Sequence, residues 1–193
     1  FLFPSGTVRS VVLPGTALHN ISNQSPVMRA AVLKAFGKPR DAIASYNKAI
    51  ELSPHYGEAY NNIAIILKEL GMHQEAISNS KRAIQLKPEA AELYNNLGDI
   101  LNELDRYEEA INSFGKALTI RLDSTDTYNN LGIALTGKGN LEDAIQALNK
   151  ALFLKSDNSR AWNNVFFPLQ IIKTKTSSNE KLTLNVPKDK NSK

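Results

Sequence analysis

Apolar residues in the middle of the chain recur at helical spacing, and the whole pattern repeats every 34 residues. Within one period, two stretches carry apolar side chains three and four positions apart, which predicts two amphipathic helices. The stretch 58–70, for example, presents Tyr60, Ile63 and Leu67 on one face, and a second such stretch covers 73–86. Glycine often separates the two stretches, so the pattern predicts pairs of helices joined by short turns.

Three columns of small residues share this period. A fixed repeat of this kind is typical of a solenoid, in which each unit packs only on its neighbours. Two antiparallel helices approach closely only where neither carries a bulky side chain, so we expect these residues at the seam within each helix pair. The columns are Ala42, Ala76, Ala110 and Ala144; Ala49, Ala83, Ala117 and Ala151; and Ala30, Ala64, Gly98 and Gly132.

The period divides the chain into four repeats and a final helix. The register is set by Pro54 and Pro88, which close the first two units. We expect an irregular segment over 1–22, a repeat array over 23–172, and a lysine-rich flexible tail or linker over 173–193. The repeats are 23–56, 57–90, 91–124 and 125–158, and the terminal helix covers 159–172.

The net charge of +4 does not indicate a nucleic-acid binder. Residues 171–193 contain six lysines against two acidic residues, so residues 1–170 are neutral overall. The array therefore lacks a basic stripe that could follow a phosphate backbone, and we expect no nucleic-acid partner. No apolar run is long enough to span a membrane, so we expect no membrane partner. The lack of cysteine is compatible with a reducing compartment, and we expect a cytoplasmic protein.

No group of residues in the sequence suggests a catalytic centre. The segment 132–139 resembles a phosphate-binding loop, but it lacks the final serine or threonine, and Gly132 belongs to an expected helix. His19, His55 and His73 share no metal-ligand spacing. We therefore expect no enzyme activity, catalytic residue, metal site or cofactor in this chain.

The repeat closely resembles the tetratricopeptide repeat. In the third unit, the family's aromatic, Leu-Gly, Ala, aromatic and Ala positions are Tyr94, Leu97, Gly98, Ala110, Phe114 and Ala117. Ser80 and Leu148 depart from the family pattern, because an aromatic residue is usual at their position. The resemblance implies an all-α, right-handed superhelical solenoid of antiparallel helix pairs. It also implies that the first helix of each pair lines the concave side.

Pairs of asparagines recur in the first helix of successive units. Asparagine is an indifferent helix former, so its return at two fixed positions needs a cause. The column resembles the asparagine ladder in the repeat arm of O-linked N-acetylglucosamine transferases, which grips the backbone of an extended peptide. An amide offers an acceptor and a donor together, as a peptide unit does. We expect peptide binding on the concave face by Asn61, Asn62, Asn95, Asn96, Asn129, Asn130, Asn163 and Asn164.

A second interpretation of this column stays open. One asparagine of each pair could instead bond to a neighbouring helix and fix the geometry of the repeat, and both roles can hold for different members. Glu58, Glu92 and Asp126 flank the column at early helix positions. Repeat proteins that clamp the acidic C-termini of heat-shock chaperones carry lysine and arginine on the concave face. The carboxylates here disfavour such a partner and favour basic or neutral peptides.

The sequence thus predicts a module that binds protein or peptide segments, as an adaptor or scaffold. The alternative is the substrate-recruiting arm of a larger enzyme, such as a glycosyltransferase, whose catalytic domain lies outside this chain. That alternative is suggested by the asparagine column and by Phe1, which is not methionine. The terminal helix carries Trp162, Phe166 and Phe167, and we expect a break or kink near Pro168. Its apolar surface would pack on a downstream domain or on a second copy of the chain, and self-assembly is a third interpretation.

Overall fold

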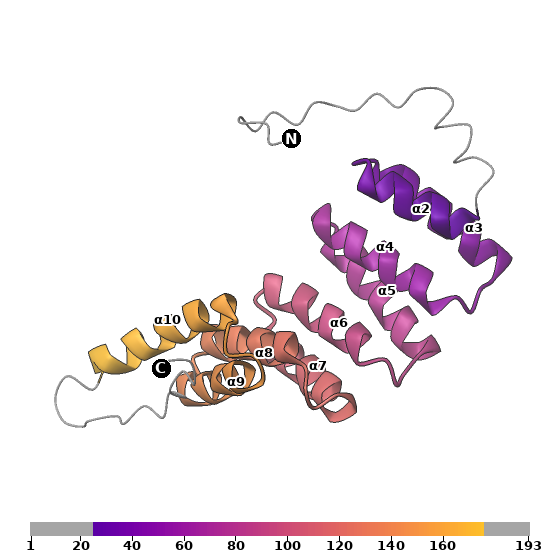
Figure 1. Ribbon diagram of the computed structural model, residues 1–193. Helices are drawn as coiled ribbons and strands as arrows, with labels where there is room; N and C mark the ends of the chain where they lie inside the picture. The colour runs from indigo at the N-terminus through magenta and orange to yellow at the C-terminus, as the bar shows by residue number, and fades with distance from the viewer. Residues whose placement is uncertain (1–24, 176–193) are drawn as a thin grey trace, which may run out of the picture.

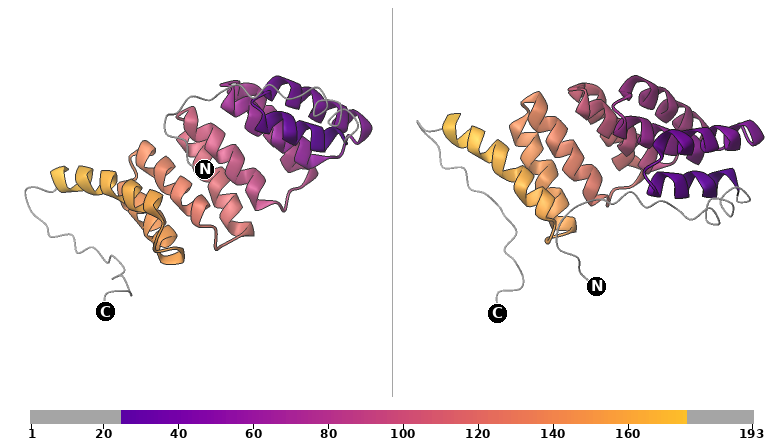
Figure 2. Two further views of the ribbon diagram at one scale, coloured as in Figure 1. Left: turned by 45° about the horizontal axis from the view of Figure 1, so that its top comes forward. Right: turned by 90° about the horizontal axis from the view of Figure 1, so that it is seen from above.

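The computed structural model describes residues 25–175, which form nine helices. The helices follow one another in space in the order of the sequence, so the described part is an elongated array (Figures 1 and 2). The predicted irregular segment 1–22 lies outside the described residues. The predicted tail 173–193 does so from residue 176 onwards, and residues 173–175 belong to the terminal helix, which was predicted to end at residue 172.

Consecutive helices form antiparallel pairs, and each pair packs on the next. The helices are α2 (Pro26–Ala35), α3 (Pro39–Leu52), α4 (Gly57–Glu69), α5 (His73–Leu86), α6 (Ala91–Glu103), α7 (Tyr107–Ile120), α8 (Thr125–Lys138), α9 (Leu141–Leu154) and α10 (Ser159–Lys175). The pairs are α2 with α3, α4 with α5, α6 with α7 and α8 with α9, while α10 packs on α9 and α8. The predicted all-α solenoid of helix pairs is confirmed.

The turn within each pair depends on one residue in the left-handed backbone region. Gly37, Gly71 and Gly139 have φ angles of 68°, 74° and 90°. Glycine adopts this conformation readily because it has no Cβ. Asp105 adopts it in the third pair with φ 56°, and its carboxylate accepts a hydrogen bond from the Tyr107 hydroxyl. The predicted short turns within the pairs, often marked by glycine, are therefore confirmed.

The small-residue columns lie at the seam inside the pairs, and all twelve members are buried. Two of them must be glycine because their partners are large. A Cβ on Gly98 would lie 2.6 Å from Cε1 of Phe114, and one on Gly132 would lie 2.4 Å from Cγ of Leu148. Gly132 is therefore a packing residue of α8, and its likeness to a phosphate-loop glycine is a coincidence of sequence.

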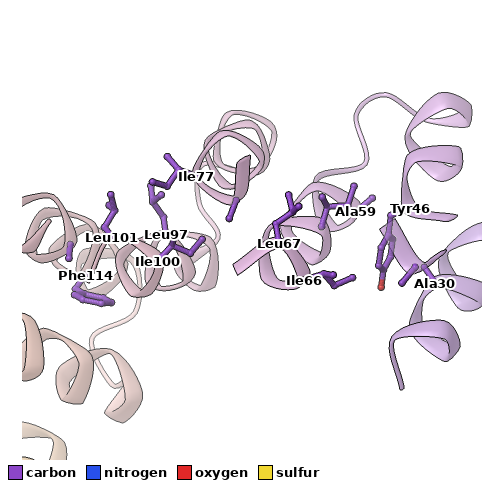
Figure 3. Close-up of a cluster of buried hydrophobic side chains, with 14 of the residues drawn as sticks. Ala30, Tyr46, Ala59, Ile66, Leu67, Ile77, Leu97, Ile100, Leu101 and Phe114 are labelled. Carbon is purple, nitrogen blue, oxygen red and sulfur yellow. The ribbon is translucent and has the colours of Figure 1, made fainter. Parts of the chain in front are cut away.

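A continuous apolar core runs between the helices from α2 to α8. Figure 3 shows Tyr46 beside Ala30 at one end of this cluster, and Ile100 and Phe114 further along it. Because each pair contacts only its neighbours, the core is a strip along the array. Along this strip the first helices from α4 onwards also contact one another, α4 with α6, α6 with α8 and α8 with α10.

The last described helix, α10, carries a large exposed apolar surface. α10 continues through Pro168, whose side chain is buried, so the proline does not end the helix. Val165 and Ile172 are buried as well, whereas Phe166 and Phe167 are 62% and 60% exposed. No helix within residues 25–175 is long and apolar enough to cross a membrane. Packing of this exposed surface on another domain or copy stays a prediction.

Candidate functional site

The asparagine column lies along the first helices α4, α6, α8 and α10 and forms a ladder of amide hydrogen bonds. The bonds join Asn96 Nδ2 to Asn61 Oδ1 at 3.0 Å, Asn130 Nδ2 to Asn95 Oδ1 at 3.4 Å, and Asn164 Nδ2 to Asn129 Oδ1 at 2.9 Å. In each case the second asparagine of one repeat donates to the first asparagine of the repeat before it. The ladder therefore connects neighbouring first helices.

The two members of the pairs differ in exposure. Asn61 and Asn129 are buried, with 8% and 3% of their surface exposed, and each accepts from the next repeat. The second members, Asn62, Asn96, Asn130 and Asn164, are all partly exposed. An amide has two N–H donors and two acceptor lone pairs, so one ladder bond does not exhaust it. The structure thus contains bonds between helices and also leaves accessible amide atoms.

The three flanking carboxylates lie in the first turns of α4, α6 and α8, and all three are exposed. Glu58 pairs with Lys87, the residue that follows α5, and this hydrogen bond holds the pKa of Glu58 below its usual value. Within the described part of the chain, Glu92 and Asp126 have no ion-pair partner. Glu92 and Asp126 are therefore the flanking carboxylates that remain available to a ligand.

A pocket of about 510 Å³ opens where α6, α8 and α10 meet. It is continuous with the asparagine column, because Asn163 and Asn164 line it. Ile133 from α8 and Phe167 from α10 supply apolar surface, and Tyr107 adds an aromatic ring. The remaining polar lining comes mainly from the end of α6 and the turn after it, namely Asn102, Glu103 and Asp105.

The polar groups of this pocket are only partly satisfied within the protein. Oδ1 of Asn102 is buried and has no hydrogen-bond partner among the described groups. Oε1 of Glu103 lies 3.2 Å from Nζ of Lys68, and Oε2 lies 3.7 Å from Nδ1 of His73, too far for a hydrogen bond. Burial alone would lower the pKa of Lys68, but the bonds to Asp99 and Glu103 outweigh it and raise this pKa.

Sequence reasoning found the column but missed the pocket. One signal was present: Ile133 and Phe167 occupy the same repeat position as Ile65 and Asp99, so this position is apolar in every unit except the one that carries Asp99. The pocket lining also includes Asp105, which occupies the turn position held by glycine in the other three helix pairs. In chemical terms the site offers amides, carboxylates and apolar surface. Within residues 25–175, no cluster of acidic, histidine or cysteine side chains is arranged to hold a metal ion.

Two sequence profiles, both described as Tetratricopeptide repeat, match the chain. One matches residues 55–123 and 89–154, and the other matches residues 27–79. Together they cover more than half of the sequence. The chain belongs to the tetratricopeptide repeat (TPR) family. No curated protein matches the sequence significantly.

Solved structures share the fold of this TPR protein. MamA, from its residue 41 to the end, of Desulfovibrio magneticus RS-1 is 21% identical with a TM-score of 0.70, over 76% of this chain and 84% of that one. YrrB, described as a TPR protein with an unusual peptide-binding site, is 20% identical with a TM-score of 0.65, over 82% and 83%. The first TPR of Spaghetti (RPAP3), bound to the HSP90 peptide SRMEEVD, is 20% identical with a TM-score of 0.59, over 60% and 92%. At these identities the likeness shows the fold.

Proposed function

We propose that this TPR protein, a protein-interaction module by its family, binds an extended segment of its partner along the asparagine column. The proposal is supported by partly exposed amides that recur on four successive first helices. Packed helices lie roughly 8–10 Å apart, which equals about three residues of extended chain. We call the partly exposed asparagine of each first helix (Asn62, Asn96, Asn130 or Asn164) a rung. Four rungs would therefore match a segment on the order of nine residues long.

The ladder itself favours binding. The bonds that Asn96, Asn130 and Asn164 donate hold these amides in one orientation before any peptide arrives. A preorganised side chain loses less conformational entropy when it binds. Each of these amides keeps one further N–H for a peptide carbonyl.

The binding free energy that these amides can supply is limited. A hydrogen bond contributes about 0.5–1.5 kcal/mol net, so four rungs give roughly 2–6 kcal/mol. This corresponds to binding around the millimolar range. Tighter binding requires side-chain contacts in addition, and the pocket beside Asn163 and Asn164 is the place in the column where such contacts are available.

Structures that share the fold support a peptide as the class of ligand, because YrrB is described as having a peptide-binding site and the first TPR of RPAP3 is bound to a peptide. The peptide in the RPAP3 structure, SRMEEVD, carries more acidic than basic residues. Here Glu92 and Asp126 flank the column without a cationic partner among the described residues, so we expect SRMEEVD to bind this chain poorly.

Replacement of Asn62 by alanine tests the proposal. Asn62 is partly exposed and takes part in no ladder bond, so Asn62→Ala removes one rung and leaves the ladder intact. We expect the Kd for a nonapeptide of alanine and serine, followed by NMR titration of the labelled chain, to rise about two- to tenfold. Asn47→Ala on α3 is the matched control and should leave the Kd unchanged. Equal affinity of Asn62→Ala and the unaltered protein would contradict the proposal.

The second candidate function is the substrate-recruiting arm of a larger enzyme. It is favoured by the resemblance of the column to the repeat arm of O-linked N-acetylglucosamine transferases. The same surface would bind the same kind of segment, and a catalytic domain elsewhere would act on it. Recovering the coding frame on both sides of this sequence tests it, because an adjoining catalytic domain is required.

A further inference from the structure

We propose that the pocket between α6, α8 and α10 takes an arginine side chain of the bound segment. The inference rests on the proposed function, because a peptide along the column brings its side chains to this pocket. Asn163 and Asn164 belong to both the column and the pocket lining, so a chain held by the last rungs lies at the pocket mouth.

The charge of the pocket is one-sided. Glu103 and Asp105 line it, and no lysine, arginine or histidine is among its lining residues. Beside it, Asp99 and Glu103 share Lys68 as a cationic partner. Three carboxylates therefore stand against one ammonium group, which leaves two formal negative charges. Complementary charge favours a cationic ligand here and opposes an anionic one.

The apolar part of the lining suits the rest of an arginine side chain. Ile133 is 37% exposed and Phe167 is 60% exposed, so both offer surface for an aliphatic stem. A planar guanidinium also stacks on aromatic faces, and Phe167 and Tyr107 both line the pocket. Gly137 allows the Tyr107 ring to lie against α8, because a Cβ there would lie 2.4 Å from Cε1 of the ring.

Hydrogen bonding favours arginine over lysine. A guanidinium carries five donors in a planar fork and no acceptor, whereas an ammonium is a point charge with three. The pocket supplies acceptors from two residues, the carboxylates of Glu103 and Asp105. Oε2 of Glu103 has no hydrogen bond from His73, which lies 3.7 Å away. A forked donor matches this arrangement.

The test uses two nonapeptides of alanine and serine that differ at the central residue, arginine in one and uncharged citrulline in the other. NMR titration of the full chain should give a Kd at least tenfold lower for the arginine peptide. In Glu103→Gln with Asp105→Asn, the two peptides should bind alike. Glu142→Gln with Asp143→Asn on α9 makes the same change of net charge away from the pocket and should retain the tenfold preference.

A further variant tests the pocket in case Glu103→Gln with Asp105→Asn disturbs the fold. Phe167→Ala removes an exposed side chain, so the fold should persist in circular dichroism while the preference for arginine falls several-fold. Equal binding of the two peptides to the unaltered chain would overturn the arginine pocket and leave the peptide-binding column standing. A tenfold preference that survives Glu103→Gln with Asp105→Asn would also overturn it. Failure of both peptides to bind would overturn the column and the pocket together.

Discussion

At the scale of single residues, position 80 shows how one unit departs from the others. Ser80 stands where Tyr46, Phe114 and Leu148 fill the seam of the other pairs. It is 1% exposed, and its hydroxyl is buried without a hydrogen-bond partner among the described groups. Ser113, in contrast, donates to the backbone oxygen of the residue four positions earlier, at 2.8 Å. A buried unpaired hydroxyl is a cost that the fold carries.

Ser80→Ala should therefore stabilise the protein. Removing the unpaired hydroxyl abolishes a desolvation penalty of about 1–3 kcal/mol, part of which the lost packing offsets. We expect the free energy of unfolding, from urea denaturation, to rise by about 1 kcal/mol. Ser113→Ala is the matched control, because it removes a hydrogen bond that is made, and it should lower the same quantity. A decrease for both variants would show that the Ser80 hydroxyl has a partner in solution.

At the scale of helices, two glycines show the effects of packing and of helix propensity separately, because one is crowded by a neighbouring side chain and the other is not. Gly98 on α6 faces the ring of Phe114, and a Cβ there would lie 2.6 Å from it. Gly115 on α7 has nothing within 4 Å of an added Cβ. Both lie inside helices, where glycine is intrinsically unfavourable. Only at Gly98 does the lack of a side chain improve packing, because it makes room for Phe114.

Gly98→Ala and Gly115→Ala should therefore change stability in opposite directions. At Gly98, overpacking against the buried Phe114 costs about 1–3 kcal/mol, which exceeds the gain of up to about 1 kcal/mol in helix propensity. At Gly115 only that gain remains. Urea denaturation of the two variants beside the unaltered protein measures both effects. A stable Gly98→Ala would mean that the seam between α6 and α7 is looser than these distances indicate.

Most of the helices could be predicted from sequence because their signals are local and periodic. Gly71 and the alanine columns mark turns and seams directly, since a left-handed φ or a close approach admits few other residues. Of the break or kink expected near Pro168, the break is wrong, and this shows where a local rule is insufficient. The helix continues there, because packing of the buried Pro168, Val165 and Ile172 holds α10 on its neighbours. The pocket could not be predicted, because its lining comes from the four helices α6, α7, α8 and α10 and from the turn residue Asp105.

At the scale of the whole molecule, stability is distributed along a line of contacts. In a stacked array it is approximately a sum of terms for each repeat and for each interface between repeats. The amide ladder belongs to the interface terms, because every ladder bond joins first helices of neighbouring repeats. The ladder thus serves the repeat geometry, and it also orients the amides that we propose bind the peptide.

Asn129 is the best residue at which to test whether the ladder bonds stabilise the packing of neighbouring repeats. It is 3% exposed, accepts from Asn164 at 2.9 Å and donates to Asn130 at 3.5 Å. Asn129→Ala leaves both neighbours without their partner, so we expect the free energy of unfolding to fall by about 1–3 kcal/mol. The urea transition should also broaden, because the last repeat and α10 would unfold more independently of the rest. Asn163→Ala, at an exposed site with no ladder bond, should leave both quantities unchanged. If Asn129→Ala did likewise, the ladder would contribute nothing to the stacking of the repeats, and peptide binding would remain as the cause of the column.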